Sequence, residues 1–163
     1  MSDVPYNLEQ VLTVIAGRLG SKPYAIRGTA SLYLQGIEMN VDDIDVLCDK
    51  EVALAFNDIF KEYLVDPVSY KESLKFKSYF GRFLIAGVGV EVMGEWQIKD
   101  TKDNWSNVFR GEEKKEIKLQ NCTLFVTPVE TELVMFAKMG RWTALTKIKK
   151  QIGTGTSLQR GLF

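Results

Sequence analysis

Two aspartates separated by one residue form the first pattern in this sequence that could carry out chemistry. Asp43 and Asp45 flank Ile44, and Val46 follows, so acidic and apolar residues alternate. On a β-strand, residues i and i+2 point to the same face, so the two carboxylates would stand side by side while the apolar residues face the core. Neighbouring carboxylates repel each other unless a cation compensates them, and Mg²⁺ commonly takes one or two carboxylates together with phosphate oxygens.

A glycine turn upstream could hold those phosphates. Gly28 and Thr29 lie between an apolar run at residues 24–26, which indicates a buried strand, and a helical pattern at residues 30–35. Glycine lets the backbone approach a ligand closely, amides at a helix N-terminus face outward, and the Thr29 hydroxyl adds one donor. We expect this turn to face the two aspartates if its strand lies beside theirs. The alternative is a glycine that only ends the strand.

Glu91 is a third acidic residue with an unusual setting, because it is a lone charge between Val90 and Val92 in an apolar strand. A charge in such a position needs a partner. A salt bridge to a surface lysine or arginine is one alternative. Another is a site in which three carboxylates from two strands and a glycine turn support two-metal nucleotidyl transfer. Asp42 would replace one of the aspartates if the strand register were shifted.

Taken together, residues 28–37, 43–45 and 90–94 resemble the nucleotidyltransferase superfamily of polymerase-β-like fold, and more closely its small bacterial and archaeal members. The resemblance runs over residues 24–152. It implies that Asp43, Asp45 and Glu91 bind Mg²⁺ in a two-metal site and that Gly28 and Thr29 hold a triphosphate. Thr29 stands where the family usually has Gly or Ser, and in relatives with a double glycine before Thr-Ala the first glycine aligns with Arg27.

Four basic residues are candidates for neutralising triphosphate charge, and for each of them solvated surface is the alternative. They are Arg27, Lys138, Arg141 and Lys147. We assign Arg27 and Lys138 to nucleotide binding together with Gly28 and Thr29.

The elements that must position these residues follow from periodicity and from capping signals. We expect helices at 8–19, 30–35, 50–63, 128–139 and 141–152, and strands at 24–26, 44–48, 65–68, 88–92 and 122–126. Residues 74–80 and 83–86 should pair with each other across Gly81 and Arg82. Asp49 is the expected cap of the third helix, and Thr127 with Glu130 forms a capping box that starts the fourth.

This order predicts one α/β (α+β) domain over residues 1–152, with a mixed β-sheet and flanking helices, followed by a flexible tail at 153–163. The resemblance makes it a nucleotidyltransferase fold.

Composition excludes several classes of protein. The 163 residues include no histidine, so no catalytic relay or metal site uses that side chain, and two cysteines cannot build a disulfide framework or a cysteine zinc cluster. The longest apolar run, residues 83–90, is far shorter than the roughly 18 residues of a membrane span. With no signal-peptide pattern, we expect a cytoplasmic protein. Equal numbers of basic and acidic residues, 21 each, argue against nucleic acid as a partner.

The expected function is therefore an Mg²⁺-dependent nucleotidyltransferase. An acceptor hydroxyl, on an unidentified small molecule or protein, attacks a nucleoside triphosphate and pyrophosphate leaves. The alternative is a nucleotide-binding or antitoxin-like regulatory interaction module on the same fold, without efficient turnover. Whether the protein forms a homodimer stays open.

Overall fold

The computed structural model describes residues 6–154. Its elements, in chain order, are α1 (Tyr6–Leu19), β1 (Ala25–Arg27), α2 (Gly28–Leu34), β2 (Asp43–Cys48), α3 (Lys50–Ile59), the 3₁₀ turn η1 (Lys61–Tyr63), β3 (Leu64–Glu72), β4 (Phe76–Ile85), β5 (Val88–Ile98), β6 (Lys115–Lys118), β7 (Thr123–Val126), α4 (Val129–Lys138) and α5 (Trp142–Thr154).

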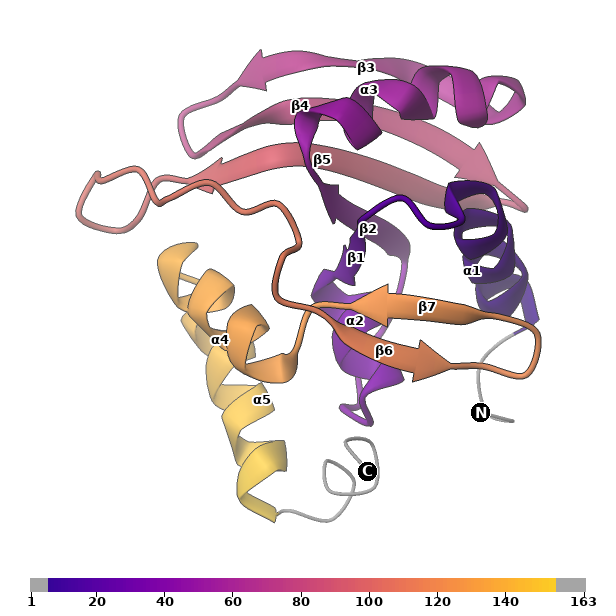
Figure 1. The fold of residues 1–163 in the computed structure, drawn as a ribbon. Helices are drawn as coiled ribbons and strands as arrows, with labels where there is room; N and C mark the ends of the chain where they lie inside the picture. Colours follow the sequence, from indigo (N-terminus) through magenta and orange to yellow (C-terminus); the bar gives the residue numbers. More distant parts are fainter. Residues whose placement is uncertain (1–5, 155–163) are drawn as a thin grey trace.

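The strands form one sheet in the order β3-β4-β5-β2-β1-β7-β6 (Figure 1). Two neighbouring pairs, β2 with β5 and β1 with β7, are parallel, and the other pairs are antiparallel. The predicted α/β domain with a mixed sheet is confirmed. The central position of β2 brings the two aspartates of the sequence pattern to the middle of the sheet.

One face of the sheet packs against α1 and α3. Alternate residues of β2 and β5 point into this core, and Ile44, Val46, Val90 and Val92 are all 0% exposed. The α3 aromatic ring of Phe56 contributes to the same cluster. Because side chains alternate along a strand, the residues between these apolar ones must point to the opposite face.

The helices of the C-terminal part form a second apolar cluster. Leu32 of α2 packs there with Val129 and Phe136 of α4 and with Leu145 and Ile148 of α5. Through Met135, α4 also belongs to a third cluster with Met93 and Trp96 of β5. The helix α4 therefore lies against the face of the sheet that α1 and α3 leave open.

The predicted pairing of residues 74–80 with 83–86 is wrong, because both segments belong to the single strand β4. Gly81 is not a turn residue. A Cβ atom at that position would lie 2.6 Å from Cγ2 of Val68, so the glycine permits β3 to approach closely. The chain instead reverses at Ala86 and Gly87, both with positive φ, and β4 pairs with β5.

The two predicted caps have different outcomes. The Asp49 carboxylate accepts a hydrogen bond from the Val52 amide at 2.8 Å, which confirms the cap of α3. The capping box at Thr127 is wrong: α4 begins at Val129 with Pro128 as its N-cap residue and without a side-chain cap. The Thr127 hydroxyl donates instead to the Ile26 carbonyl, because this residue continues the contact between β7 and β1.

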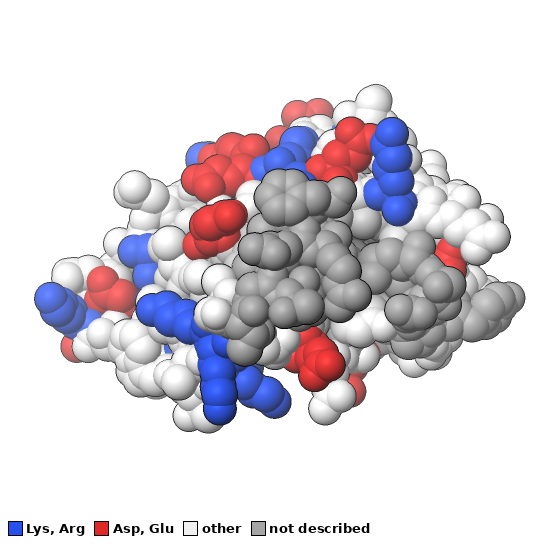
Figure 2. Space-filling model, turned by 90° about the horizontal axis from the view of Figure 1, so that it is seen from below, with Lys and Arg blue, Asp and Glu red and all other residues white. Residues whose placement is uncertain are grey.

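Two further observations bear on the predicted partners. The first is that, within residues 6–154, every helix is too short or too polar to cross a membrane. The second is the distribution of charged side chains on the surface. In the view from below, several Lys and Arg side chains gather at the lower left, and others lie among acidic side chains along the upper edge (Figure 2). The predicted tail falls mostly on residues 155–163, which lie outside the described residues, and Gly153 belongs to α5.

Candidate functional site

A row of four charged side chains crosses the open face of the sheet. Strand pairing places Arg27 of β1 opposite Asp45 of β2, Asp45 opposite Glu91 of β5, and Glu91 opposite Arg82 of β4. Directly opposed residues point to the same face, so the four side chains are neighbours. We call Arg27, Asp45, Glu91 and Arg82 the charge row.

Each acid of the charge row lies beside an arginine. Nη1 of Arg27 is 3.6 Å from Oδ2 of Asp45, and Nε of Arg82 is 3.1 Å from Oε2 of Glu91. The first pair is partly buried, with side-chain exposures of 7% and 23%, whereas the Arg82 side chain is 59% exposed. The Arg27–Asp45 separation is too long for a hydrogen bond, so it is an electrostatic contact only.

A buried glutamate that the sequence did not reveal holds the other side of Arg27. The Glu132 side chain on α4 is 0% exposed, accepts a hydrogen bond from Nη2 of Arg27 at 3.3 Å, and accepts another from the Gly28 amide at 3.0 Å. A buried charge is tolerated only when it is paired and hydrogen-bonded, and these two contacts supply that pairing. Glu132 thus uses the amide that we expected to face a phosphate.

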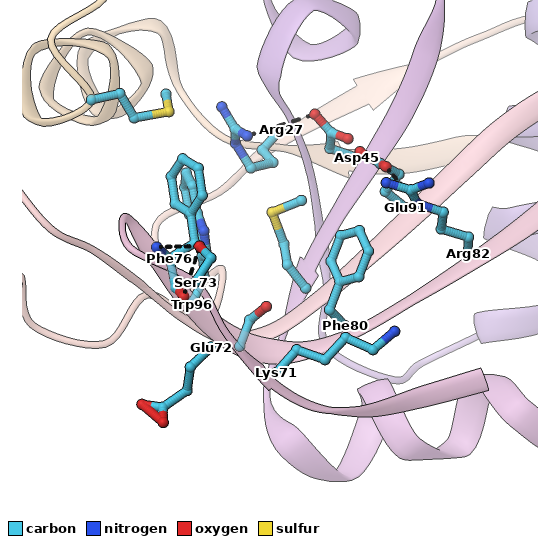
Figure 3. A pocket seen from close by; sticks show the side chains of 13 residues that line it. Arg27, Asp45, Lys71, Glu72, Ser73, Phe76, Phe80, Arg82, Glu91 and Trp96 are labelled. Atoms are coloured by element: carbon cyan, nitrogen blue, oxygen red, sulfur yellow. Dashed lines mark hydrogen bonds and ion pairs between the residues drawn. The ribbon is translucent and has the colours of Figure 1, made fainter. Parts of the chain in front are cut away.

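The charge row borders a cavity of about 540 Å³ (Figure 3). A cavity of this size accommodates a nucleotide or another small molecule. Its lining comprises charged and polar side chains of Arg27, Asp45, Lys71, Glu72, Ser73, Ser78, Arg82 and Glu91, and apolar side chains of Phe76, Phe80, Met93, Trp96 and Met139. Charged and aromatic groups therefore line the same cavity.

The aromatic wall is partly occupied by contacts within the protein. Trp96 stacks on Phe76 with ring centroids 5.8 Å apart, and the Arg27 guanidinium lies 4.5 Å from the centroid of the Trp96 ring. Both contacts hold Trp96 in place and orient Arg27.

Burial makes Asp45 an unusual acid. It raises the pKa of this carboxyl to about 6, the neighbouring Arg27 lowers the pKa, and the carboxylates of Glu91, Glu132 and Asp43 raise it again. Two guanidinium groups thus face four carboxylates, which leaves the site with a negative balance that an added cation would reduce.

The carboxylates of Asp43 and Asp45 are of the chemical type that holds a magnesium ion. Each faces a glycine: a Cβ at Gly28 would lie 2.9 Å from Oδ2 of Asp45, and a Cβ at Gly89 would lie 2.7 Å from Oδ1 of Asp43. The missing side chains leave both carboxylates uncrowded, and carboxylate oxygens are the ligands that Mg²⁺ prefers. Among residues 6–154, no cluster of three or more acidic or cysteine side chains is arranged to hold a metal. A magnesium ion at Asp43 and Asp45 would thus need further oxygen ligands.

The structure brings some of the predicted residues together and leaves others apart. Arg27, Asp45 and Glu91 line the cavity, and Asp43 lies exposed at the start of β2, two residues from Asp45. Gly28 and Thr29 form the first turn of α2. The basic residues Lys138, Arg141 and Lys147 are not among the residues that line the cavity. Lys138 instead lies near Asp100 and contributes to lowering the pKa of that carboxyl, which is lowered chiefly by backbone hydrogen bonds.

Sequence reasoning missed four charged residues of the site: Arg82 and Glu132, which contact predicted members, and Lys71 and Glu72, which line the cavity. Arg82 could have been found from strand alternation had Gly81 not suggested a turn, because it shares a face with Phe80 only in a continuous β4. Glu132 carries a weaker signal, a single acid on the buried side of an amphipathic helix. Its partners lie 104 and 105 residues away in the sequence, so no local pattern identifies them.

Comparisons with known proteins were informative in one case. No model of a known protein family matches the chain, and no curated protein matches it. Among solved structures, one from Thermotoga maritima, described as "a putative nucleotidyltransferase", superposes with a TM-score of 0.75 and 27% sequence identity. The match covers 90% of this chain and 93% of the other.

Proposed function

Since the chain has a nucleotidyltransferase-like fold, we propose that it binds a nucleoside triphosphate with Mg²⁺ in the cavity beside the charge row and transfers a nucleoside monophosphate to an acceptor hydroxyl. The observation that carries the proposal is the placement of Asp45 and Glu91 side by side on parallel strands at the wall of a cavity of about 540 Å³.

Asp43 and Asp45 would hold the magnesium ion, and triphosphate oxygens would complete its coordination. When bound, magnesium supplies positive charge that stabilises the charge developing on the phosphate oxygens. Gly28 and Gly89 support this role because a Cβ at either position would crowd one of the two carboxylates.

The protein's own groups would orient the substrates and move one proton. The acceptor oxygen forms a bond to the α-phosphorus, the bond from that phosphorus to the bridging oxygen of the β-phosphate breaks, and pyrophosphate leaves with the electron pair. Glu91 takes the proton of the acceptor hydroxyl. Arg82, 3.1 Å from the Glu91 carboxylate, holds this base in position.

Phosphate binding would depend on the guanidinium of Arg27 more than on the backbone turn. The Gly28 amide already donates to Glu132, whereas Arg27 lines the cavity. Guanidinium groups match phosphate oxygens in geometry and in charge. The Thr29 hydroxyl, in the first turn of α2, would be a second donor for the triphosphate.

The test measures thermal stability with each of the four nucleoside triphosphates, with and without Mg²⁺, for the parent and for Asp45→Asn. A ligand at 100 times its dissociation constant stabilises the native state by about 2.7 kcal/mol. We expect a Mg²⁺-dependent shift for the parent and its loss in the variant. Asp58→Asn, which changes an exposed acid on α3, is the matched control and should shift like the parent. No shift with any nucleotide would contradict the proposal.

A nucleotide-binding module without turnover is the second candidate, and the position of Arg27 favours it. The guanidinium lies 3.6 Å from the Asp45 carboxylate, and this contact already balances part of the negative charge that a metal ion would otherwise balance. Release of pyrophosphate distinguishes the two functions once the nucleotide is known. Metal-dependent release with candidate acceptors supports transfer, and tight binding without release under any of these conditions supports the module.

A further inference from the structure

Arg27 is held between two acids at the wall of the cavity. Its Nη2 donates to the buried carboxylate of Glu132 at 3.3 Å, and its Nη1 lies 3.6 Å from the Asp45 carboxylate, outside hydrogen-bond range. The tighter of the two contacts is therefore with Glu132, which lies on α4 and is not a member of the proposed metal site. The contact with Asp45 is the one that can be exchanged.

The third nitrogen of the guanidinium is unused. Nε of Arg27 is buried and has no hydrogen-bond partner within the described residues. The whole side chain is only 7% exposed, and it lines the cavity. A buried donor without a partner costs free energy in the unliganded protein. An anionic group bound in the cavity would satisfy it, and a phosphate oxygen is the acceptor that a guanidinium binds best.

Arg27 and a metal ion compete for the same carboxylate. A divalent cation at Asp45 would lie close to the guanidinium, and two cations near one acid in a partly buried site repel each other strongly. A triphosphate removes this conflict because its negative charge attracts both cations. The guanidinium need not travel far, since Glu132 and the face of Trp96, 4.5 Å from the Arg27 guanidinium carbon, fix its place.

We propose that Arg27 is a built-in counter-cation for Asp45. The triphosphate takes over the contact that Arg27 makes with Asp45, so that the metal ion enters the site with the nucleotide and not before it. The inference rests on the proposed nucleotide site. It assigns Arg27 two opposing effects: the side chain weakens the binding of a metal ion alone and strengthens the binding of a nucleotide alone.

Two binding measurements separate these effects. The first titrates Mn²⁺, as a paramagnetic substitute for Mg²⁺, into nucleotide-free protein and follows free Mn²⁺ by electron paramagnetic resonance. The second titrates the nucleoside triphosphate that the thermal screen identifies into protein kept in excess EDTA and follows binding by calorimetry. Both use the parent, Arg27→Met, Arg27→Lys and Arg18→Met.

In Arg27→Met we expect Mn²⁺ to bind on the order of tenfold more tightly and the metal-free nucleotide to bind on the order of tenfold more weakly, the size of one charge-assisted hydrogen bond. Arg27→Lys keeps the positive charge and should stay within about threefold of the parent for Mn²⁺. Arg18→Met is the matched control: Arg18 pairs with Glu62, neither residue is among those that line the cavity, and the substitution should leave both affinities unchanged.

Equal Mn²⁺ affinity in the parent and in Arg27→Met would overturn the inference, as would equal gains in the Met and Lys variants. Circular dichroism establishes that each variant is folded before titration. If Arg27→Met does not fold, Arg27→Gln, which also removes the charge, replaces it: a tenfold gain in Mn²⁺ affinity supports the counter-cation role, and an affinity equal to that of the parent overturns it. Failure of the proposed function is seen separately, as the absence of any nucleotide binding to the parent, with or without metal.

Discussion

The two faces of β2 and β5 carry opposite kinds of side chain. Facing α1 and α3, Ile44, Val46, Val90 and Val92 are fully buried among apolar side chains. Facing the cavity, Asp45 and Glu91 keep side-chain exposures of 23% and 27% and lie between two arginines. The same two strands build both environments, because successive side chains point in opposite directions.

The two faces also make opposite contributions to stability. Removing apolar area from water on the α1 and α3 face favours folding, at roughly 25 cal/mol per Å². On the cavity face, burial opposes the charged form of Asp45, which is why the pKa of that carboxyl rises to about 6. One face can therefore hold charges in an unfavourable arrangement because the other face stabilises the strands that carry them.

The largest expected effect comes from replacing a charge on the cavity face. Asp45→Asn should lower nucleotidyl transfer at least ~10³-fold, since a metal ligand contributes several kcal/mol to transition-state stabilisation. It should leave the metal-free protein as stable as the parent or more so. The pKa of Asp45 is higher in the folded protein, so parent stability falls as pH rises from 3.8 towards about 6, and the variant lacks this loss. Pyrophosphate release, and urea unfolding in EDTA at pH 4 and pH 7.5, test both statements.

A loss of stability at pH 7.5 in this variant would contradict the contrast between the two faces. Retained transfer would contradict the assignment of Asp45 to the site.

Replacing an apolar residue on the face that packs against α1 and α3 should lower stability and leave nucleotide affinity almost unchanged. Ile44→Ala removes a fully buried side chain and should lower the free energy of unfolding by about 2–5 kcal/mol, because a cavity is left in the core. Nucleotide affinity, measured well below the midpoint of unfolding, should stay within about twofold of the parent. Ile44→Val, expected to cost about 0.5–1.5 kcal/mol, provides the graded control. A change of tenfold in affinity without unfolding would show that the two faces are coupled.

A smaller effect is expected at Gly28, where backbone conformation and the position of the Asp45 carboxylate both constrain the residue. This residue has φ +73°, and an added Cβ would lie 2.9 Å from Oδ2 of Asp45. Gly28→Ala should cost roughly 1–2 kcal/mol for the left-handed backbone and also displace the Asp45 carboxylate, weakening metal-dependent nucleotide binding. Gly20→Ala is the matched control, because Gly20 has φ +57° with open space around its Cβ position. It should lose similar stability and keep nucleotide affinity, and equal losses of affinity in both variants would contradict the prediction.

The smallest effect is expected at an acid that lies outside both regions. The two terminal nitrogens of the Arg18 guanidinium donate to the Glu62 carboxylate, at 2.7 and 2.8 Å, and this pairing lowers the pKa of Glu62 to about 2. Because the folded-state pKa is the lower one, the stabilisation is present above pH 4.5 and disappears as pH falls towards 2. Glu62→Gln should therefore lower the unfolding midpoint slightly at pH 7 and not at all at pH 2.

Nucleotide affinity in Glu62→Gln should equal that of the parent. Thermal unfolding, followed by circular dichroism at pH 7 and at pH 2, measures the change in the unfolding midpoint. A difference that persists undiminished at pH 2 would contradict the assignment. The comparison with Asp45 shows that carboxyl groups in one molecule shift in opposite directions, according to whether burial or a close arginine dominates.

Local sequence patterns were sufficient for most of the elements and for part of the site. Alternation at residues 43–46 gave both the strand and the shared face of its two aspartates, and Asp49 correctly marked the start of α3. Local patterns gave wrong predictions where the role of a residue depends on a contact with a residue outside the local pattern. Gly81 permits the approach of Val68, and the Thr127 hydroxyl donates to the carbonyl of Ile26.

What the sequence determined by itself was therefore the class of fold, the strand with Asp43 and Asp45, and the identity of Glu91 as an acid out of place in an apolar strand. The tertiary structure decided which groups surround those acids. Arg27 and Arg82 pair with Asp45 and Glu91 across neighbouring strands, and Glu132 holds Arg27 from a helix that begins 101 residues after Gly28. The reason is physical. Periodicity and capping act over a few residues, whereas electrostatic partners are chosen by strand order and register, which depend on how the whole core packs.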